Sequence, residues 1–123
     1  MKFDKLSNQV IECAIEVHRN LGPGLLESTY EQCPAYELTQ KKIRFKLQHS
    51  LPVEYKDIKL DCGYRIDVLV EDLLILELKS VETVLPIHEA QLLTYMKLSK
   101  IKIGLLINFN VKKLKEGLKR FVI

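Results

Sequence analysis

The segment GYRIDVLVEDLLILELKS, residues 63–80, constrains the fold more than any other part of the chain. It contains two aliphatic runs separated by a short polar stretch, a pattern typical of two buried strands joined by a tight turn. Asp67, Glu77 and Lys79 interrupt these runs. A charged side chain in a buried strand costs free energy unless it is paired or binds something, so these three residues are the first candidates for a functional site.

The relative position of the three charges depends on the strand register. Side chains alternate along a strand, which places Glu77 and Lys79 on one face. A two-residue turn at 71–72 pairs Asp67 with Leu76 and puts the two acids on opposite faces. A three-residue turn or a bulge pairs Asp67 directly with Glu77. The sequence leaves both registers open.

A meeting of Asp67 and Glu77 would have a chemical consequence. Two carboxylates about 4 Å apart repel by about 1 kcal/mol in water and about 4 kcal/mol at an effective dielectric constant near 20. A lysine offsets part of this repulsion, and a divalent cation such as Mg²⁺ or Mn²⁺ offsets more. Such a site can hydrolyse a phosphodiester. The alternative is a buried ion pair of Lys79 with an acid that serves packing, and it explains the ExK pattern better when that pattern is taken alone.

The remaining pattern predicts a mixed α/β domain with the element order ααββββαβα and a possible last strand. A kink or break is expected where Pro34 falls inside the second helix. The expected elements are helices over 5–20 and 25–40, two short strands within 44–61, strands over 63–70 and 74–80, a helix from Pro86, a strand over 102–109, a basic helix over 111–120 and an edge strand at 121–123.

Composition narrows the class of protein. The length of 123 residues fits a single domain over 1–123. Cys13, Cys33 and Cys62 are odd in number and form no CxxC pair, which argues against disulfides and a zinc site and favours a reducing cytoplasm. The net charge of +3 permits an anionic partner without requiring one. Neither a signal peptide nor a membrane span is expected, because no long apolar run occurs.

Two further segments carry polar residues at helical spacing. GLLESTYE contains Glu27 and Tyr30, and HEAQLLTYMKL contains His88, Gln91 and Tyr95, the last two one helical turn apart. Each residue also has a structural alternative. In these alternatives Glu27 interacts with the helix dipole, Tyr30 packs in the core, His88 caps a helix, and Gln91 with Tyr95 forms an exposed polar seam.

The ordered set of these residues resembles the PD-(D/E)XK nuclease superfamily and, within it, the small GxxExxY proteins. The segments that carry the likeness are GPGLLESTYE, GYRIDVLVE, ELKSVE, HEAQLLTYMKL and GLLINFNV, and they extend from about residue 10 to about residue 122. Ile66 stands where the superfamily name has proline. The resemblance implies a restriction-endonuclease-like core, a central mixed β-sheet flanked by helices.

The resemblance also implies roles for individual residues. The implied metal ligands are Asp67, Glu77 and the backbone carbonyl of Leu78, with Glu27 as an indirect or second-metal ligand. The implied catalytic residues are Glu27, Asp67, Glu77, Lys79 and Gln91, with Lys79 as the catalytic lysine. The residues expected to contact substrate are Tyr30, Arg65, His88 and Tyr95.

These observations lead to one hypothesis and two alternatives. The hypothesis is a Mg²⁺-dependent (or Mn²⁺-dependent) nuclease-like protein that hydrolyses phosphodiester bonds of DNA or RNA. The first alternative is a catalytically silent nucleic-acid-binding or protein-interaction module on the same fold, and the second is a hydrolase of a small phosphate. A chain of this size leaves little room for a substrate-selecting domain, so a homodimer or a partner protein could present the nucleic acid.

Overall fold

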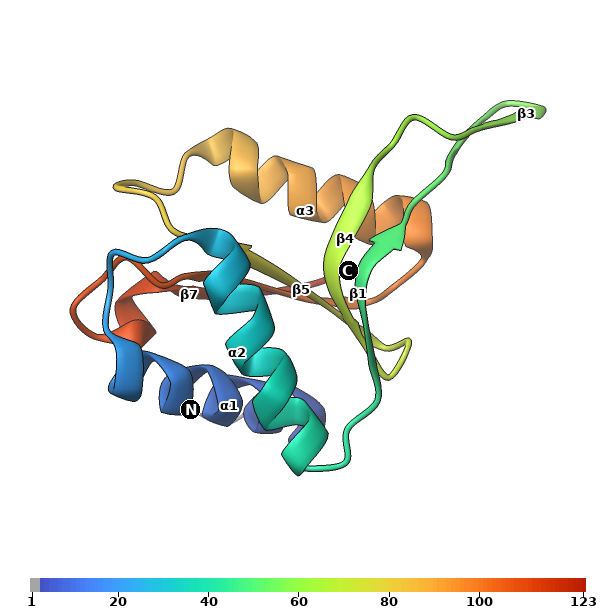
Figure 1. The fold of residues 1–123 in the computed structure, drawn as a ribbon. Coiled ribbons are helices and arrows are strands. Elements are labelled where there is room, and N and C mark those ends of the chain that lie inside the picture. Colours follow the sequence, from blue (N-terminus) through green and yellow to red (C-terminus); the bar gives the residue numbers. More distant parts are fainter. Residues whose placement is uncertain (1–2) are drawn as a thin grey trace.

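The computed structural model describes residues 3–123, which form a five-stranded sheet, a separate two-stranded ribbon and three α-helices (Figure 1). In chain order the elements are α1 (Lys5–Leu21), α2 (Glu27–Gln40), β1 (Phe45–Ser50), β2 (Val53–Tyr55), β3 (Ile58–Leu60), β4 (Arg65–Val70), β5 (Leu74–Lys79), α3 (Pro86–Ser99), β6 (Ile103–Asn108), the 3₁₀ turn η1 (Leu114–Gly117) and β7 (Leu118–Val122). The predicted mixed α/β class is confirmed.

The main sheet has the strand order β1-β4-β5-β6-β7. Only β5 and β6 run parallel, and α3 connects them, as a parallel pair requires a crossover. Helices α1 and α2 cover one face of the sheet and α3 covers the other (Figure 1). Leu76 and Leu78 of β5 pack in the α1/α2 core, whereas Ile75 packs with residues of α3. The alternation therefore directs Glu77 and Lys79 toward the side of α3.

Both N-terminal helices begin close to the predicted residues. The Asp4 carboxylate caps α1 by accepting a hydrogen bond from the backbone N–H of Ser7 at 3.0 Å, and it forms an ion pair with Arg120 at 2.7 Å. Gly22, with φ 71°, ends α1. The break expected at Pro34 does not occur, since α2 continues through it. Pro34 is buried, and its packing offsets the backbone hydrogen bond that its ring removes.

Two expectations about secondary structure were wrong. Five strands rather than four precede α3, because the run after residue 44 divides at Leu51-Pro52 into β1 of the main sheet and β2 of the ribbon. The basic helix expected over 111–120 is replaced by η1 and β7. Without β7, β6 would leave a row of backbone groups unpaired at the sheet edge, so strand pairing outweighs the helical pattern of a short segment.

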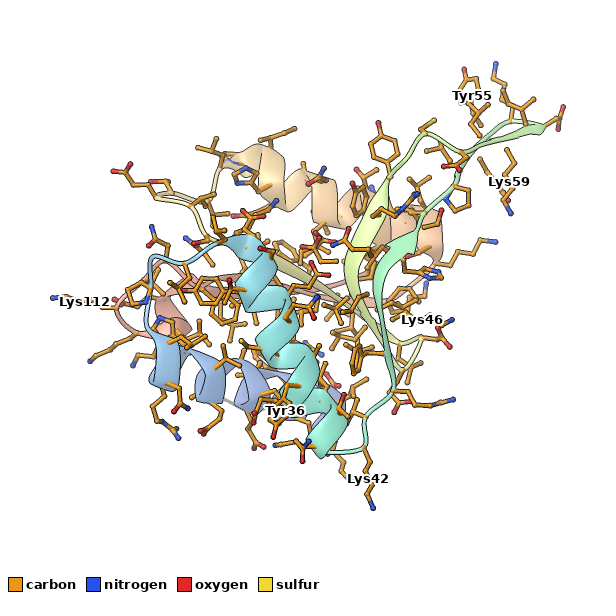
Figure 2. The ribbon with its side chains drawn as sticks, in the orientation of Figure 1. Tyr36, Lys42, Lys46, Tyr55, Lys59 and Lys112 are labelled. Atoms are coloured by element: carbon orange, nitrogen blue, oxygen red, sulfur yellow. The ribbon has the colours of Figure 1, made fainter. Side chains whose placement is uncertain are left out.

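The ribbon of β2 and β3 extends away from the body of the molecule (Figure 1). A turn at Lys56-Asp57 joins its strands. All three residues of β3 are exposed, and Figure 2 shows Tyr55 and Lys59 clear of the helices and the main sheet. The ribbon therefore contributes little to the core.

No helix among residues 3–123 is long and apolar enough to cross a membrane. The three cysteines are unpaired, with Cys13 buried, Cys33 half-buried and Cys62 exposed.

Candidate active site

The turn between β4 and β5 resolves the register that the sequence left open. Val70 pairs with Leu74, so the turn holds the three residues 71–73 rather than two. Two of these turn residues have φ of 54° and 55°, in the left-handed region. One step beyond the last ladder pair, this register brings Asp67 opposite Glu77. Glu77 lies on the face that α3 covers, and the Asp67 side chain lies between β4 and β5, where it binds the N–H of Leu78.

Asp67 and Glu77 each bind the backbone of the other's strand. Oδ2 of Asp67 accepts a hydrogen bond from the N–H of Leu78 at 2.9 Å, and Oε1 of Glu77 accepts one from the N–H of Asp67 at 3.3 Å. In a strand, the carbonyl of a residue points toward the same neighbouring strand as its N–H. Because the N–H of Leu78 binds Asp67 of β4, the carbonyl of Leu78 also points toward β4. The second oxygen of each carboxyl group is not used by any backbone group of residues 3–123.

Burial of Glu77 changes its protonation. The residue is only 5% exposed. Burial, and then the negative charge of Asp67, raise the pKa of Glu77 to about 9, while Lys79 opposes this rise. Without a cation, Glu77 therefore holds a proton at neutral pH, as one member of a close pair of acids generally does.

This proton predicts how stability depends on pH. Between the ordinary pKa of 4.5 and the folded value of about 9, the folded chain binds a proton that the unfolded chain releases. The contribution to stability is complete below about pH 4.5 and is lost as pH rises through 9. In EDTA, the free energy of unfolding should fall between about pH 6 and 8.5 with a slope of at most about 1.4 kcal/mol per pH unit.

Glu77→Gln serves as the comparison, because it keeps the size of the side chain but cannot ionise. Its stability should vary less with pH than that of the wild type in urea unfolding experiments. Parallel curves for the two proteins would contradict the assigned protonation of Glu77.

Lys79 lies two residues after Glu77, at the end of β5, and its side chain is half-buried. The carbonyl of Lys79 accepts a hydrogen bond from the N–H of Phe109 at 2.9 Å. Buried Asn108 binds the next part of the chain, accepting from the N–H of Val81 at 3.1 Å and donating to its carbonyl at 2.9 Å. No carboxylate of residues 3–123 forms an ion pair with Lys79 within 4.0 Å. The packing alternative, a buried ion pair, is therefore not present in the described chain.

Glu27 ties the start of α2 to the end of β5. It is the first residue of the helix, and its Oε2 accepts a hydrogen bond from the N–H of Ser80 at 3.3 Å. The Ser80 hydroxyl donates to the carbonyl of Leu25 at 2.6 Å. Glu27 thus lies beside the residue that follows Lys79 and remains exposed. Glu27 also lies at the N-terminus of α2, where a carboxylate interacts favourably with the helix dipole, as the structural alternative predicted.

Two residues near Asp67 were not predicted. Glu31 lies one helical turn after Glu27, and Gln48 lies in β1. The Gln48 amide donates to Glu31 at 2.8 Å and lies 3.5 Å from Oδ1 of Asp67. Burial, and to a smaller extent the charge of Asp67, raise the pKa of Glu31.

The backbone is irregular where Gln48 meets β4. The ladder between β1 and β4 skips Gln48 and Asp67, and Gln48 has φ 49° although it is not glycine. Such strain is often found at functional sites. Pairing with β1 resumes at Ile66, whereas pairing with β5 ends at Val68, and the N–H of Asp67 binds Glu77.

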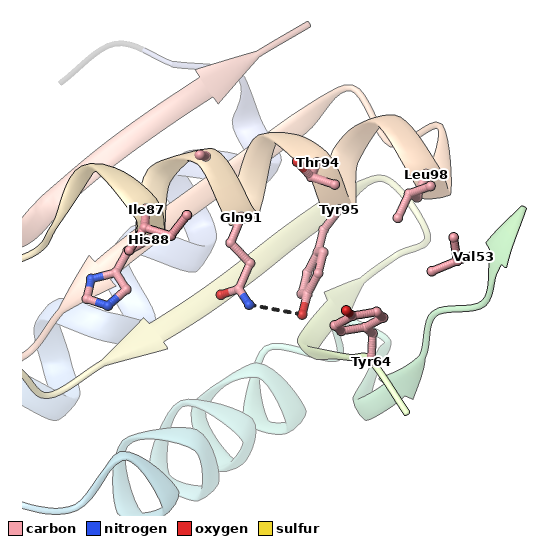
Figure 3. A pocket seen from close by; sticks show the side chains of 9 residues that line it. Val53, Tyr64, Ile87, His88, Gln91, Thr94, Tyr95 and Leu98 are labelled. Atoms are coloured by element: carbon pink, nitrogen blue, oxygen red, sulfur yellow. Dashed lines mark hydrogen bonds between the residues drawn. The ribbon is translucent and has the colours of Figure 1, made fainter. Parts of the chain in front are cut away.

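Helix α3 supplies Gln91 and Tyr95 to the same region. The Gln91 amide donates to the Tyr95 hydroxyl at 3.3 Å (Figure 3). Tyr95 is only 7% exposed. Its pKa is raised by burial first and then by the charges of Glu77, Tyr64 and Asp67, so its hydroxyl lies near the acids. Tyr95 is therefore not part of an exposed polar seam, whereas Gln91 is exposed on the same face of α3.

The remaining predicted substrate contacts have different surroundings. Tyr30 is fully buried and stacks on Phe109 at 4.4 Å between ring centroids. Its hydroxyl donates to the carbonyl of Gly22 at 2.5 Å. This corrects the expectation that Tyr30 contacts substrate, because its ring has no face left for a base.

His88 and Arg65 remain near the surface. Nδ1 of His88 accepts a hydrogen bond from the N–H of Leu85 at 3.0 Å and so caps α3. Arg65 is exposed at the start of β4, where its guanidinium donates to the carbonyl of Tyr64 at 3.0 Å and to the Ser50 hydroxyl at 3.3 Å.

The donor set decides which metal ion the site could hold. Within residues 3–123, no three His, Cys, Asp or Glu side chains gather closely enough to enclose a metal. The acids Asp67 and Glu77 and the Leu78 carbonyl offer oxygen donors only. Mg²⁺ keeps several of its waters and is commonly bound by one or two carboxylates, whereas zinc sites prefer Cys and His. The residues therefore fit Mg²⁺ or Mn²⁺.

A protein-family model described as the PD-(D/E)XK nuclease superfamily matches residues 4–121, nearly the whole chain. No curated protein and no solved structure gives a significant match. The match confirms the resemblance at the level of the superfamily, and the mixed sheet flanked by helices is consistent with its restriction-endonuclease-like fold. Membership of the GxxExxY group stays a prediction.

Proposed function

Because the chain belongs to the PD-(D/E)XK nuclease superfamily, we propose that it is a Mg²⁺-dependent enzyme that hydrolyses phosphodiester bonds of nucleic acids. One observation carries the proposal: two carboxylates face each other across β4 and β5, with a lysine beside them that has no ion-pair partner within residues 3–123.

Asp67, Glu77 and the Leu78 carbonyl would hold the ion in this proposal. When bound, Mg²⁺ lowers the pKa of a coordinated water and supplies positive charge beside the phosphate. Lys79 lies two residues after Glu77 in β5, and its ammonium would orient the attacking water or stabilise the negative charge of the transition state.

In this proposal four residues around the metal ligands and Lys79 also contribute: Glu27, Gln91, Tyr95 and Arg65. Glu27, which binds the N–H of Ser80 at the end of β5, would act through a water or on a second ion. Gln91 orients the Tyr95 hydroxyl, and that hydroxyl can donate to the phosphate or to a carboxylate. Arg65 is exposed at the start of β4 and suits a phosphate of the substrate backbone.

Removing the metal ligand gives a direct test. In titration calorimetry with Mn²⁺, we expect the wild-type protein to bind and Asp67→Asn to bind more than about 100-fold more weakly, since replacing a residue that only hydrogen-bonds to a metal ligand already costs about 10–100-fold. The control is Asp72→Asn, an exposed aspartate in the neighbouring turn, which should bind as the wild type does.

Cleavage is measured in parallel on labelled single-stranded DNA, duplex DNA and RNA. We expect cleavage with Mg²⁺ or Mn²⁺ and none with EDTA. Cleavage that persists in EDTA would contradict the mechanism. Metal binding without cleavage on every substrate would favour the catalytically silent module.

Two further features belong to this proposal. We place the protein in the cytoplasm, where a reducing medium keeps the three cysteines as thiols. A homodimer or a partner protein remains a possible means of presenting the nucleic acid.

A further inference from the structure

An apolar cavity of about 670 Å³ lies beside the proposed catalytic groups (Figure 3). Its walls are one side of α3, Tyr64 just before β4, and Val53 at the start of β2. Its volume falls within the range of pockets that hold small organic ligands. Tyr95 and Gln91 line it, whereas Asp67 and Glu77 do not.

An exposed aromatic ring stands at this cavity. Tyr64 is 45% exposed, and its ring centroid lies 6.1 Å from that of Tyr95, with the ring planes 60° apart. Tyr95 itself is buried and bound to Gln91. Tyr64 therefore has ring surface available for stacking, whereas Tyr95 forms part of the wall.

The polar groups of the cavity are few and complementary. His88 accepts through Nδ1 from a backbone N–H, so its Nε2 carries the proton and can donate. Gln91 uses its amide N–H on Tyr95, which leaves its Oε1 as an acceptor. A ligand with a flat aromatic face and an edge that both donates and accepts suits these walls, and a nucleobase has that chemistry.

The surroundings match a base that belongs to a strand. Arg65 follows Tyr64 directly and is exposed, so its guanidinium can contact a phosphate next to the stacked base. Tyr95 lines the cavity, and the charges of Glu77 and Asp67 contribute to the raised pKa of its hydroxyl, so the proposed base site and the acids share this residue as a neighbour.

We propose that this cavity binds one unpaired nucleobase of the strand to be cut, so that the protein acts on single-stranded or locally opened nucleic acid. The inference rests on the proposed function and names its substrate class. A base in a duplex has its faces covered by its neighbours and cannot stack on Tyr64 without leaving the helix.

The test compares a strand with bases and one without them. A thymidine strand of about 12 nucleotides, a length within reported single-strand site sizes, and an abasic strand of equal length carry the same phosphates. Binding is measured by fluorescence anisotropy in EDTA, where cleavage is not expected. The wild type should prefer the thymidine strand, and Tyr64→Ala should lower its affinity for that strand by about 5–150-fold, the value of one stacked base.

The matched control is Tyr36→Ala, which removes another exposed tyrosine, 62% exposed, from α2. It should bind both strands as the wild type does. For the abasic strand, Tyr64→Ala and the wild type should have equal affinity. If the wild type does not distinguish the two strands, or Tyr64→Ala keeps the preference for bases, the pocket assignment is wrong.

Free thymidine monophosphate distinguishes a strand from a free nucleotide as the source of the base. Competition that requires a large excess over the strand supports the proposal, and tighter binding of the free nucleotide overturns it. Failure of the nuclease proposal remains separable. Strand binding that depends on Tyr64 without any cleavage would support the base pocket and contradict the nuclease proposal. Cleavage without a preference for bases would support the nuclease proposal and contradict the base pocket.

Discussion

Replacing Lys79 with alanine is expected to reduce the rate of Mg²⁺-dependent cleavage by about 10²–10⁴-fold, the usual value of a positioned proton-transfer or charge-stabilising group. The fold should survive, because the Lys79 side chain forms no ion pair within residues 3–123 and the strand end is held through its backbone. Single-turnover cleavage at saturating Mg²⁺ measures the first effect and thermal unfolding the second.

Lys102→Ala provides the control, since Lys102 is an exposed lysine just before β6. It removes the same charge without touching the site and should cut at the wild-type rate. Glu77→Ala should lose cleavage as Lys79→Ala does. If Lys79→Ala cuts as fast as the wild type under strict metal control, the lysine has no catalytic role and the mechanism must be revised.

Gly117→Ala is expected to lower the free energy of unfolding by about 3 kcal/mol or more, at the upper end of the cost of overpacking. A Cβ at this position would overlap the carbonyl oxygen of Asn108 and lie 3.2 Å from a methyl group of Val111. Asn108 cannot move freely, because its buried amide holds both the N–H and the carbonyl of Val81.

The effect should also reach the proposed site, since Asn108 pairs with Lys79 across β5 and β6. Urea unfolding measures the stability loss, and Lys115→Ala, an exposed change in the same 3₁₀ turn, should remain within about 0.5 kcal/mol of the wild type. A loss below about 1 kcal/mol for Gly117→Ala would mean that η1 shifts to make room.

The sequence predicted those parts of the fold that depend on local pattern. Helix α3 begins at Pro86 as expected, and the continuous apolar run of β6 forms a buried strand. Local pattern failed at the C-terminus, where pairing with β6 determines the structure of residues 118–122. It also failed for Pro34, since burial of the proline compensates for the missing hydrogen bond.

The sequence indicated which residues are candidates for the site, but it did not determine how they are arranged in space. Asp67, Glu77 and Lys79 are visible as charges in aliphatic strands, but their convergence depends on one residue of turn length. Glu31 could have been noticed from its spacing of four from Glu27. Gln48 gave no signal, because it reaches Asp67 only through the pairing of β1 with β4.

The three-residue turn at 71–73 has an evolutionary consequence. Its side chains do not need to be Glu, Asp and Leu, because asparagine or glycine also adopts the left-handed conformation that two of these positions require. The length of the turn, in contrast, cannot change, because it sets the register of β4 against β5. A gene that lost one codon here would still encode both acids and the lysine in the same order, yet Asp67 would turn to the opposite face. Natural variation in this segment should therefore consist of substitutions rather than insertions or deletions.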